Sequence, residues 1–359
     1  MYPQLRIDLR KLEHNAKTLL DRCKDNGISI AVVTKGFCAD PKMVEVLNHL
    51  PFEFLADSRL ENIENYPKER RARTMMLRLP LPSEAHRIVK SCDVSLNSEL
   101  HTLQLLSEAA ESLGVTHGVI LMVDLGDLRE GIYYKDTPLL HKTVEYIISQ
   151  GSLALEGIGV NLTCYGSVLA TETNMQQLCD IAKEIEDKYK IKLKLISGGN
   201  SSSLYLLEQD VMPQEINNLR LGDSIISGLE AAFLKPFPGL EQNVITLAAE
   251  VIELQEKPSM PEGELGVNAF GEKVEFTDIG FHKRAILSVG RQDTDYEGLV
   301  CLEEGIVVLG SSSDHLILDV TEATRELRVG DIVEFSLSYG GILAGFTSKY
   351  VSRGYICKT

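Results

Sequence analysis

The chain has 359 residues and a formal net charge of −16, from 52 acidic and 36 basic residues. This balance argues against a nucleic-acid partner or an anionic membrane partner, because both carry the same sign of charge as the chain. No apolar run reaches membrane-spanning length and the first residues lack a secretory signal, so we expect a cytoplasmic protein. Seven scattered cysteines without CxxC spacing predict reduced thiols, with no disulfide framework and no zinc site.

From residue 28 to about 224, short apolar runs alternate with amphipathic stretches of helical period. The stretch 98–114 is one such helix, and Gly114 is a suitable stop for it. Eight strands separated by helices predict an α/β fold, a (β/α)8 TIM-type barrel, with an open doubly wound sheet as the alternative. The runs that predict strands are 28–35, 52–58, 73–79, 93–98, 117–126, 154–163, 192–199 and 216–224.

From about residue 240 the pattern changes to short strands joined by Gly, Pro, Asp and Ser turns. The sequence therefore predicts two domains, a barrel over 1–235 and an all-β domain over 236–359. The connector is the segment 233–239, whose two prolines block a helix. Residues 1–10 contain a short strand-like run, and pairing with the β domain is one option for it.

Three features point to a site at the carboxyl ends of the barrel strands, where the active sites of this fold lie. Lys35 stands at the exit of the first run, either as a solvated strand end or as a lysine that forms a Schiff base. The loop 197–203, SGGNSSS, follows the seventh run, and Arg220 and Gly222 belong to the eighth. Loops after strands seven and eight commonly bind phosphate in such barrels. A phosphorylated aldehyde would use all three features, which predicts pyridoxal 5′-phosphate (PLP) as the cofactor.

Eight segments in chain order carry a resemblance to a known family: AVVTKGFCAD, FLADSR, VDLGDLREG, GVNLTCYG, SGGNSSS, NLRLGDS, GRQDTD and SSSDHLILDV. Through them the chain resembles the alanine racemase group of PLP enzymes, fold type III, and most closely its ornithine and lysine racemase branch. The resemblance covers nearly the whole length and implies a barrel with a carboxyl-terminal β domain. It also implies an amino-acid racemase that works as a head-to-tail homodimer, with residues of both subunits in each site.

The resemblance implies a role for individual residues of the barrel. Lys35 would bind PLP and act as one of two proton-transfer bases. Arg129 would contact the phenolic oxygen of the cofactor and the substrate carboxylate, and Arg220 would face the pyridine nitrogen. Asn161 falls where alanine racemases place a histidine beside the ring.

Around the phosphate, the chain both matches the family and departs from it. Ser201 and the amide near Gly222 correspond to phosphate contacts, and Asn200 belongs to the same loop. Alanine racemases follow the PLP lysine with a tyrosine that reaches the phosphate. The stretch KGFCAD has no tyrosine, so another group must replace that contact.

The second base is also not the family's residue. Alanine racemases supply it as a tyrosine from the β domain of the partner chain, but the corresponding stretch, roughly GELGVNAFGEK, contains none. The candidates are Asp314 and His315, because a histidine or an Asp–His pair has a pKa suited to proton transfer near neutrality. Alternatively, Asp314 is a turn residue and His315 a structural histidine. Tyr165 and Cys164 are the next candidates.

For the substrate, the resemblance points to a basic amino acid such as ornithine or lysine. Its side chain would need a carboxylate, which Asp293 or Asp295 would supply unless these are solvated loop charges. The alternatives are an alanine racemase, another fold type III PLP enzyme such as a decarboxylase or D-amino-acid lyase, or a non-catalytic PLP-binding protein. Known proteins of the last kind resemble the barrel alone, so the predicted β domain argues against it.

Overall fold

The structure is a computed structural model and describes residues 1–357. It divides into two compact units. The barrel domain comprises Lys11–Gln242, and the β domain comprises Met1–Arg10 together with the chain from Asn243 onward. The predicted connector, 233–239, lies in the barrel domain, where β12 (Lys235–Pro236) pairs with β11 (Leu229–Glu230).

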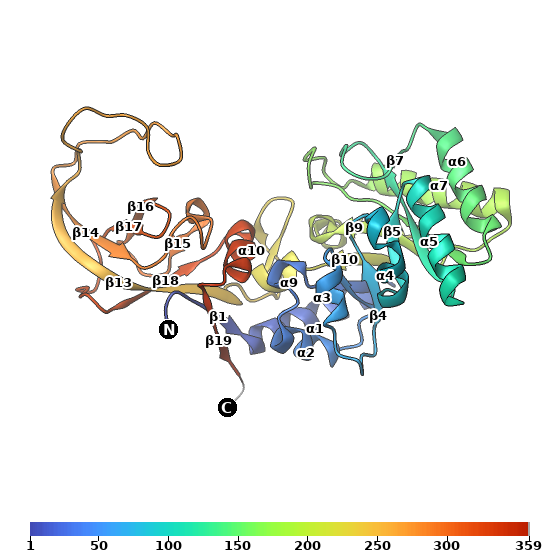
Figure 1. Cartoon of the computed structure of the whole chain (residues 1–359), viewed down its shortest axis with the longest axis horizontal. Coiled ribbons are helices and arrows are strands. Elements are labelled where there is room, and N and C mark those ends of the chain that lie inside the picture. The colour runs from blue at the N-terminus through green and yellow to red at the C-terminus, as the bar shows by residue number, and fades with distance from the viewer. Residues whose placement is uncertain (358–359) are drawn as a thin grey trace. The chain divides into compact units, whose positions relative to one another are not determined.

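In the described residues, eight parallel strands close into a barrel (Figure 1). The strand order is β5-β4-β3-β2-β10-β9-β8-β6, and β5 pairs with β6 to close the ring. The closure confirms the predicted TIM-type barrel and excludes the open doubly wound sheet. The eight strands are β2 (Ser29–Val33), β3 (Phe54–Asp57), β4 (Arg73–Met76), β5 (Val94–Asn97), β6 (His117–Asp124), β8 (Leu153–Gly159), β9 (Leu195–Asn200) and β10 (Asn218–Leu221).

The helices that connect these strands begin and end where local chemistry favours it. Asp40 caps α2 by accepting the N–H groups of Lys42 and Met43, and α5 ends at Gly114, whose φ of 64° suits glycine. The helices are α1 (Leu9–Asp25), α2 (Pro41–Asn48), α3 (Leu60–Glu64), α4 (Ala85–Ser91), α5 (Leu100–Leu113), α6 (Thr137–Ser149), α7 (Glu172–Tyr189), α8 (Tyr205–Glu208) and α9 (Asp223–Ser227). None of the helices within residues 1–357 is both long enough and apolar enough to cross a membrane.

The amino-terminal end of the barrel is stabilised by an ion pair. Arg73, the first residue of β4, forms two hydrogen bonds of 2.8 Å with Glu156 of β8, and Lys194 lies 3.7 Å from the same carboxylate. Above this pair, apolar side chains such as Phe54 and Met122 fill the interior. The polar groups of the opposite, carboxyl-terminal end are therefore the candidates for a site.

The β domain is built mainly from antiparallel strands in the order β15-β18-β13-β14-β17-β16. The amino-terminal strand β1 belongs to it, because β1 pairs with β13 antiparallel and with β19 parallel. Figure 1 shows β13 as a long curved strand, followed by a wide loop that returns to β14. We call this loop, residues 259–280, the arm. The elements are β1 (Gln4–Asp8), β13 (Ile245–Pro258), β14 (Phe281–Leu287), β15 (Val300–Cys301), β16 (Val307–Ser311), β17 (Leu316–Asp319), β18 (Ile332–Ser336), α10 (Tyr339–Thr347) and β19 (Ser352–Ile356).

Candidate functional site

Lys35 lies at the carboxyl end of β2, as the first residue of a single 3₁₀ turn, η1 (Lys35–Phe37). Its side chain is exposed. Asp223 begins α9 after β10, the strand beside β2 in the barrel. Burial raises the pKa of Asp223 to about 6, while a hydrogen bond with Ser227 and the positive charge of Lys35 act in the opposite direction. The lysine and this carboxyl group therefore interact across adjacent strand exits.

Arg220 of β10 is a buried cation inside the same end of the barrel, with 3% of its surface exposed. Its guanidinium donates to Ser197 Oγ at 2.5 Å, to Val160 O at 2.6 Å and to Asn161 Oδ1 at 2.9 Å. Burial lowers its pKa to about 10, and the nearby negative charge of Glu130 acts against that decrease. Arg220 is therefore still protonated at neutral pH, and its donors are fixed in direction.

Arg129 and Arg220 are linked through a carboxylate that the sequence did not reveal. Arg129 donates to Glu130 from Nε and, at 2.6 Å, from Nη2. Asn161 donates its Nδ2 hydrogen to the same carboxylate and accepts from Arg220. Burial acts to raise the pKa of Glu130, but the hydrogen bond and charge of Arg129 outweigh it and lower the pKa overall. Arg129, Glu130, Asn161 and Arg220 thus form one continuous network.

Asp127 fixes the loops that carry this network. Its buried carboxylate accepts the backbone N–H groups of Cys164 at 3.2 Å, Tyr165 at 3.0 Å and Val168 at 3.1 Å. The loop after β8 is thereby joined to the loop that carries Arg129. Cys164 Sγ accepts a hydrogen from Asn200 at 3.4 Å, whereas the Tyr165 side chain is largely exposed. Of these two further base candidates, Cys164 is the one in contact with the network.

The loop after β9 forms a cradle with the start of α9. Asn200 accepts the Ser202 N–H at 2.8 Å and so begins the turn η3 (Ser201–Ser203), and Ser201 Oγ accepts the Ser224 N–H at 3.2 Å. Ser224 Oγ is buried without a hydrogen-bond partner within the described residues. A buried hydroxyl of this kind is suited to donate to a bound anion. The cradle therefore fits the phosphate of the predicted cofactor.

Gly222 brings the cradle close to Lys35. A Cβ atom at Gly222 would lie 2.7 Å from Val33 O and 2.8 Å from Val33 Cβ. Only a glycine permits β10 to approach the end of β2 this closely, and Lys35 follows Val33 by two residues. The predicted residues of the barrel domain, from Lys35 to Gly222, thus follow the exits of β2, β10, β9, β8 and β6, at the same end of the barrel.

The two base candidates of the β domain lie in the turn that joins β16 to β17. His315 Nδ1 is 2.8 Å from Asp314 Oδ1, and about half of each side chain is exposed. The turn is closed by the Ser312 N–H, which donates to His315 O at 2.8 Å. The hydrogen bond from His315 lowers the pKa of Asp314. The pair is therefore an ionised carboxylate beside an exposed imidazole.

The two candidate substrate carboxylates are already bonded inside the β domain. Asp293 is 4% exposed and accepts from Ser348 Oγ at 2.9 Å and from the Gly290 N–H at 3.3 Å. Asp295 accepts from Ser338 Oγ at 3.3 Å. Asp293 and Asp295 thus connect the segment 290–298 to the two residues that flank α10, Ser348 after its end and Ser338 before its start.

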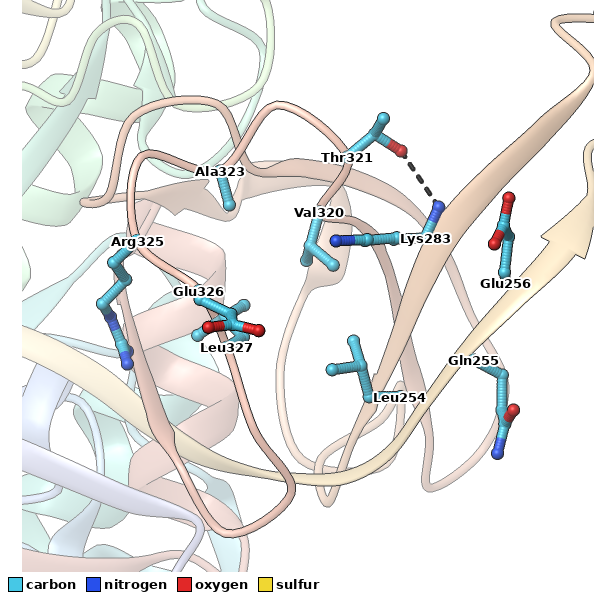
Figure 2. A pocket seen from close by; sticks show the side chains of 10 residues that line it. All are labelled: Leu254, Gln255, Glu256, Lys283, Val320, Thr321, Ala323, Arg325, Glu326 and Leu327. Atoms are coloured by element: carbon cyan, nitrogen blue, oxygen red, sulfur yellow. Dashed lines mark hydrogen bonds between the residues drawn. The ribbon is translucent and has the colours of Figure 1, made fainter.

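A separate cleft of about 390 Å³ lies within the β domain (Figure 2). Side chains of β13, β14 and the segment 320–327 line it, and the Lys283 N–H donates to Thr321 Oγ1 at 3.0 Å at its edge. None of the predicted site residues lines this cleft. Among residues 1–357, no three His, Cys, Asp or Glu side chains are grouped so as to hold a metal ion.

Comparisons with known proteins agree with the resemblance. A model of the family described as "Alanine racemase, N-terminal domain" matches residues 7–229. The chain is 43% identical over 353 residues to an ornithine racemase of Acetoanaerobium sticklandii, with 98% of this chain and 99% of that protein covered. It is 36% identical over 356 residues to a lysine racemase of Thermotoga maritima, with 99% of each covered.

The fold agrees with solved structures of the same group. A structure of alanine racemase from Bartonella henselae with covalently bound pyridoxal phosphate superposes with a TM-score of 0.74, at 17% identity. It covers 98% of this chain, and 99% of that chain is matched. At 17% identity this structural similarity shows the fold alone. The family model and the two relatives show the family. The chain belongs to the alanine racemase family.

Proposed function

We propose that the substrate of this amino-acid racemase is a basic amino acid, ornithine or lysine, and that its cofactor is PLP. One observation carries the proposal. Lys35, the buried Arg220 and the Ser201–Ser224 cradle lie at the ends of three adjacent strands, in a chain whose relatives racemise ornithine and lysine. Ornithine is preferred over lysine as the first substrate to test because that relative is the more similar of the two.

The residues of the site fit the aldehyde, the ring nitrogen and the phosphate of PLP. The amine of Lys35 would hold the aldehyde covalently, and Arg220 would face the ring nitrogen. Ser201 and the Gly222 amide would hold the phosphate, and Ser224 Oγ, buried and unpartnered in the described chain, would replace the missing tyrosine. When bound, PLP makes the hydrogen at Cα of an attached amino acid acidic.

The chain's own residues then manage the proton and the charges. Lys35 removes or returns the proton on one face of Cα. Arg220, protonated at neutral pH, would face the ring nitrogen as a hydrogen-bond donor and leave that nitrogen unprotonated. Glu130 keeps the Arg129 fork oriented and leaves part of that side chain exposed toward a substrate carboxylate.

The opposite face of Cα needs a second base, and we propose the Asp314–His315 pair of a partner chain in a head-to-tail homodimer. An exposed imidazole hydrogen-bonded to an ionised carboxylate is suited to this role. Asp293 and Asp295 remain proposed contacts for the side-chain amine of the substrate. The seven cysteines are free, which supports a reducing, cytoplasmic location.

Exposed apolar side chains on the arm support the dimer. Large apolar side chains left exposed along one segment mark a surface that another chain covers, so we infer that a second copy covers the arm. The large apolar residues exposed on the arm and at its end are Met260, Leu265, Val267, Phe270, Val274, Phe276, Ile279 and Phe281.

The assembly is tested by light scattering on the purified protein. We expect a mass twice that of one chain, and a shift toward the monomer with loss of activity when Val267 and Phe276 are both changed to Asp. Val115→Asp, at an exposed apolar residue of the barrel domain, is the matched control and leaves the dimer intact. A fully active monomer would contradict the proposed assembly.

The substrate is tested with a panel of L-amino acids in deuterium oxide. We expect optical rotation to vanish and deuterium to enter Cα with L-ornithine and L-lysine, at rates about 10-fold or more above that with L-alanine, because a missing amine leaves its partner unpaired. The D enantiomers serve as the matched reverse reaction. Faster turnover of alanine would make the enzyme an alanine racemase, and inactivity toward every amino acid would overturn racemisation.

A further inference from the structure

Thr34, the residue directly before Lys35, has all of its polar groups bonded. Its N–H donates to Ala56 O at 2.9 Å, and its carbonyl accepts the N–H groups of Phe37 at 3.1 Å and Ala39 at 3.2 Å. Its hydroxyl is turned away from the turn that it starts and lies 2.5 Å from Asp57 Oδ2. The backbone at the end of β2 is therefore fixed on both sides of the peptide that leads into Lys35.

The hydroxyl belongs to a buried chain of hydrogen bonds with a defined direction. Asp57 Oδ1 accepts the Arg59 N–H at 2.8 Å and Asn62 Nδ2 at 3.1 Å, so the carboxylate acts as an acceptor. Thr34 gives its single hydroxyl hydrogen to Asp57 at 2.5 Å rather than to Ala56 O at 3.4 Å, and the Tyr66 hydroxyl, 2.7 Å away, must then donate to Thr34. Thr34 and Asp57 are fully buried, and Tyr66 is 5% exposed.

The turn after Lys35 needs such an anchor. Cys38 and Ala39 have φ angles of 49° and 48°, two consecutive left-handed residues that are not glycine. Strained backbone of this kind persists only where surrounding contacts hold it, and it is common at functional sites. The Thr34 carbonyl holds the turn through Phe37 and Ala39, and the Thr34 hydroxyl holds Thr34 itself.

We propose that Thr34, Asp57 and Tyr66 form a clamp that positions the amine of Lys35 for its reaction with the cofactor and for proton transfer. They are positioning residues, because they act through the backbone of Lys35 and need not touch the substrate. The inference rests on the proposed function, which makes Lys35 the cofactor lysine. A purely structural role for the three residues would change stability alone.

The test compares Thr34→Val, which removes the hydroxyl, with Thr34→Ser, which keeps it. For each holoenzyme, total bound PLP is measured after denaturation, and the part fixed to the Lys35 peptide by borohydride is measured by mass. Thr34→Val should lower the fixed fraction of bound PLP and reduce kcat about 10- to 100-fold with little change in KM, because small displacements of a reacting group are costly. Thr34→Ser should restore both values.

Thr143→Val is the matched control. It removes another fully buried threonine hydroxyl, which donates to Leu139 O at 2.9 Å within α6. This variant should leave the fixed fraction and kcat unchanged, whatever it does to the melting temperature. If Thr34→Val fails to fold, the same measurements are made on Asp57→Asn. This variant replaces an acceptor of the clamp with a group that also donates, and we expect the same decrease in the fraction of PLP fixed to Lys35.

The outcomes separate the clamp from the proposed function. If borohydride fixes PLP of the unaltered protein to a residue other than Lys35, the proposed cofactor lysine is wrong. If Lys35 is the fixed residue and Thr34→Val or Asp57→Asn matches the unaltered protein in fixed fraction and kcat, the clamp is wrong and the proposed function stands. Equal losses in Thr143→Val would also overturn the clamp.

Discussion

Replacing Lys35 with alanine should abolish racemisation, with a fall in kcat of about 10³-fold or more, because the change removes both the covalent anchor of the cofactor and one of the two bases. The unaltered holoenzyme should be yellow, with absorption near ~420 nm that is characteristic of PLP bound to a lysine. The variant should lose this band. Its cradle and Arg220 are intact, so it should still bind PLP without fixing it when borohydride is added.

The matched control is Lys90→Ala, at an exposed lysine of α4. It removes the same charge from the barrel domain and should keep the yellow colour and full activity. Peptide mapping after borohydride reduction checks the assignment directly. A PLP adduct that persists in Lys35→Ala, on any other lysine, would show that the end of β2 does not carry the cofactor.

The barrel could be predicted because its information is local. Each buried strand is a short apolar run, and each helix is a stretch with its own period and caps, as at Asp40 and Gly114. Closure of the barrel depends on the pairing of β5 with β6, and a periodic pattern does not distinguish that pairing from an open sheet. Periodicity left open whether the sheet is closed or open, and the resemblance to the alanine racemase family indicated the closed barrel.

The site was predictable only where a motif placed a residue at a strand exit. Lys35 and Arg220 lie at such positions, and Gly222, two residues after Arg220, marks a close approach to Val33. Glu130 was missed because an Arg–Glu dipeptide in a loop is usually solvated, and its partner Asn161 is 31 residues away. Asp57 is the last residue of β3, and its contact with Thr34 could not be predicted because it depends on the pairing of β2 with β3.

The β domain shows the same limit. Asp293 is a candidate contact for the substrate amine, but the sequence did not indicate that it accepts a hydrogen bond from Ser348, 55 residues further along the chain. The arm has no strand period, yet Arg291 organises its tip through two hydrogen bonds with Glu272, at 2.8 and 2.7 Å, and by stacking on Phe270. Contacts over such sequence separations are set by tertiary packing and leave no local pattern.

Changing His315 to alanine should stop inversion without stopping all proton exchange. If His315 serves the face opposite Lys35, the variant should exchange the Cα hydrogen of one enantiomer with deuterium oxide and retain its configuration, because Lys35 still works on its own face. The other enantiomer should exchange its Cα hydrogen more slowly by a factor of about 10² or more, which is the usual contribution of a positioned base. Asp314→Ala should give a smaller loss, since it removes only the hydrogen bond that orients the imidazole. If both variants racemise at the unaltered rate, the base is elsewhere, and Cys164 and Tyr165 are tested next.

Mixing two inactive variants then asks whether the two bases come from different chains. In a head-to-tail dimer of Lys35→Ala with His315→Ala, one site receives both alanines and the other receives the intact Lys35 of one chain and the intact His315 of its partner. Random pairing makes half of the dimers hybrid, and each hybrid has one working site of two, so co-refolded variants should recover about a quarter of the unaltered activity. Separately refolded and then mixed proteins are the control, and they gain activity only as fast as subunits exchange. If each site drew both bases from a single chain, every mixture would stay inactive, and the proposed division of the bases between subunits would be wrong.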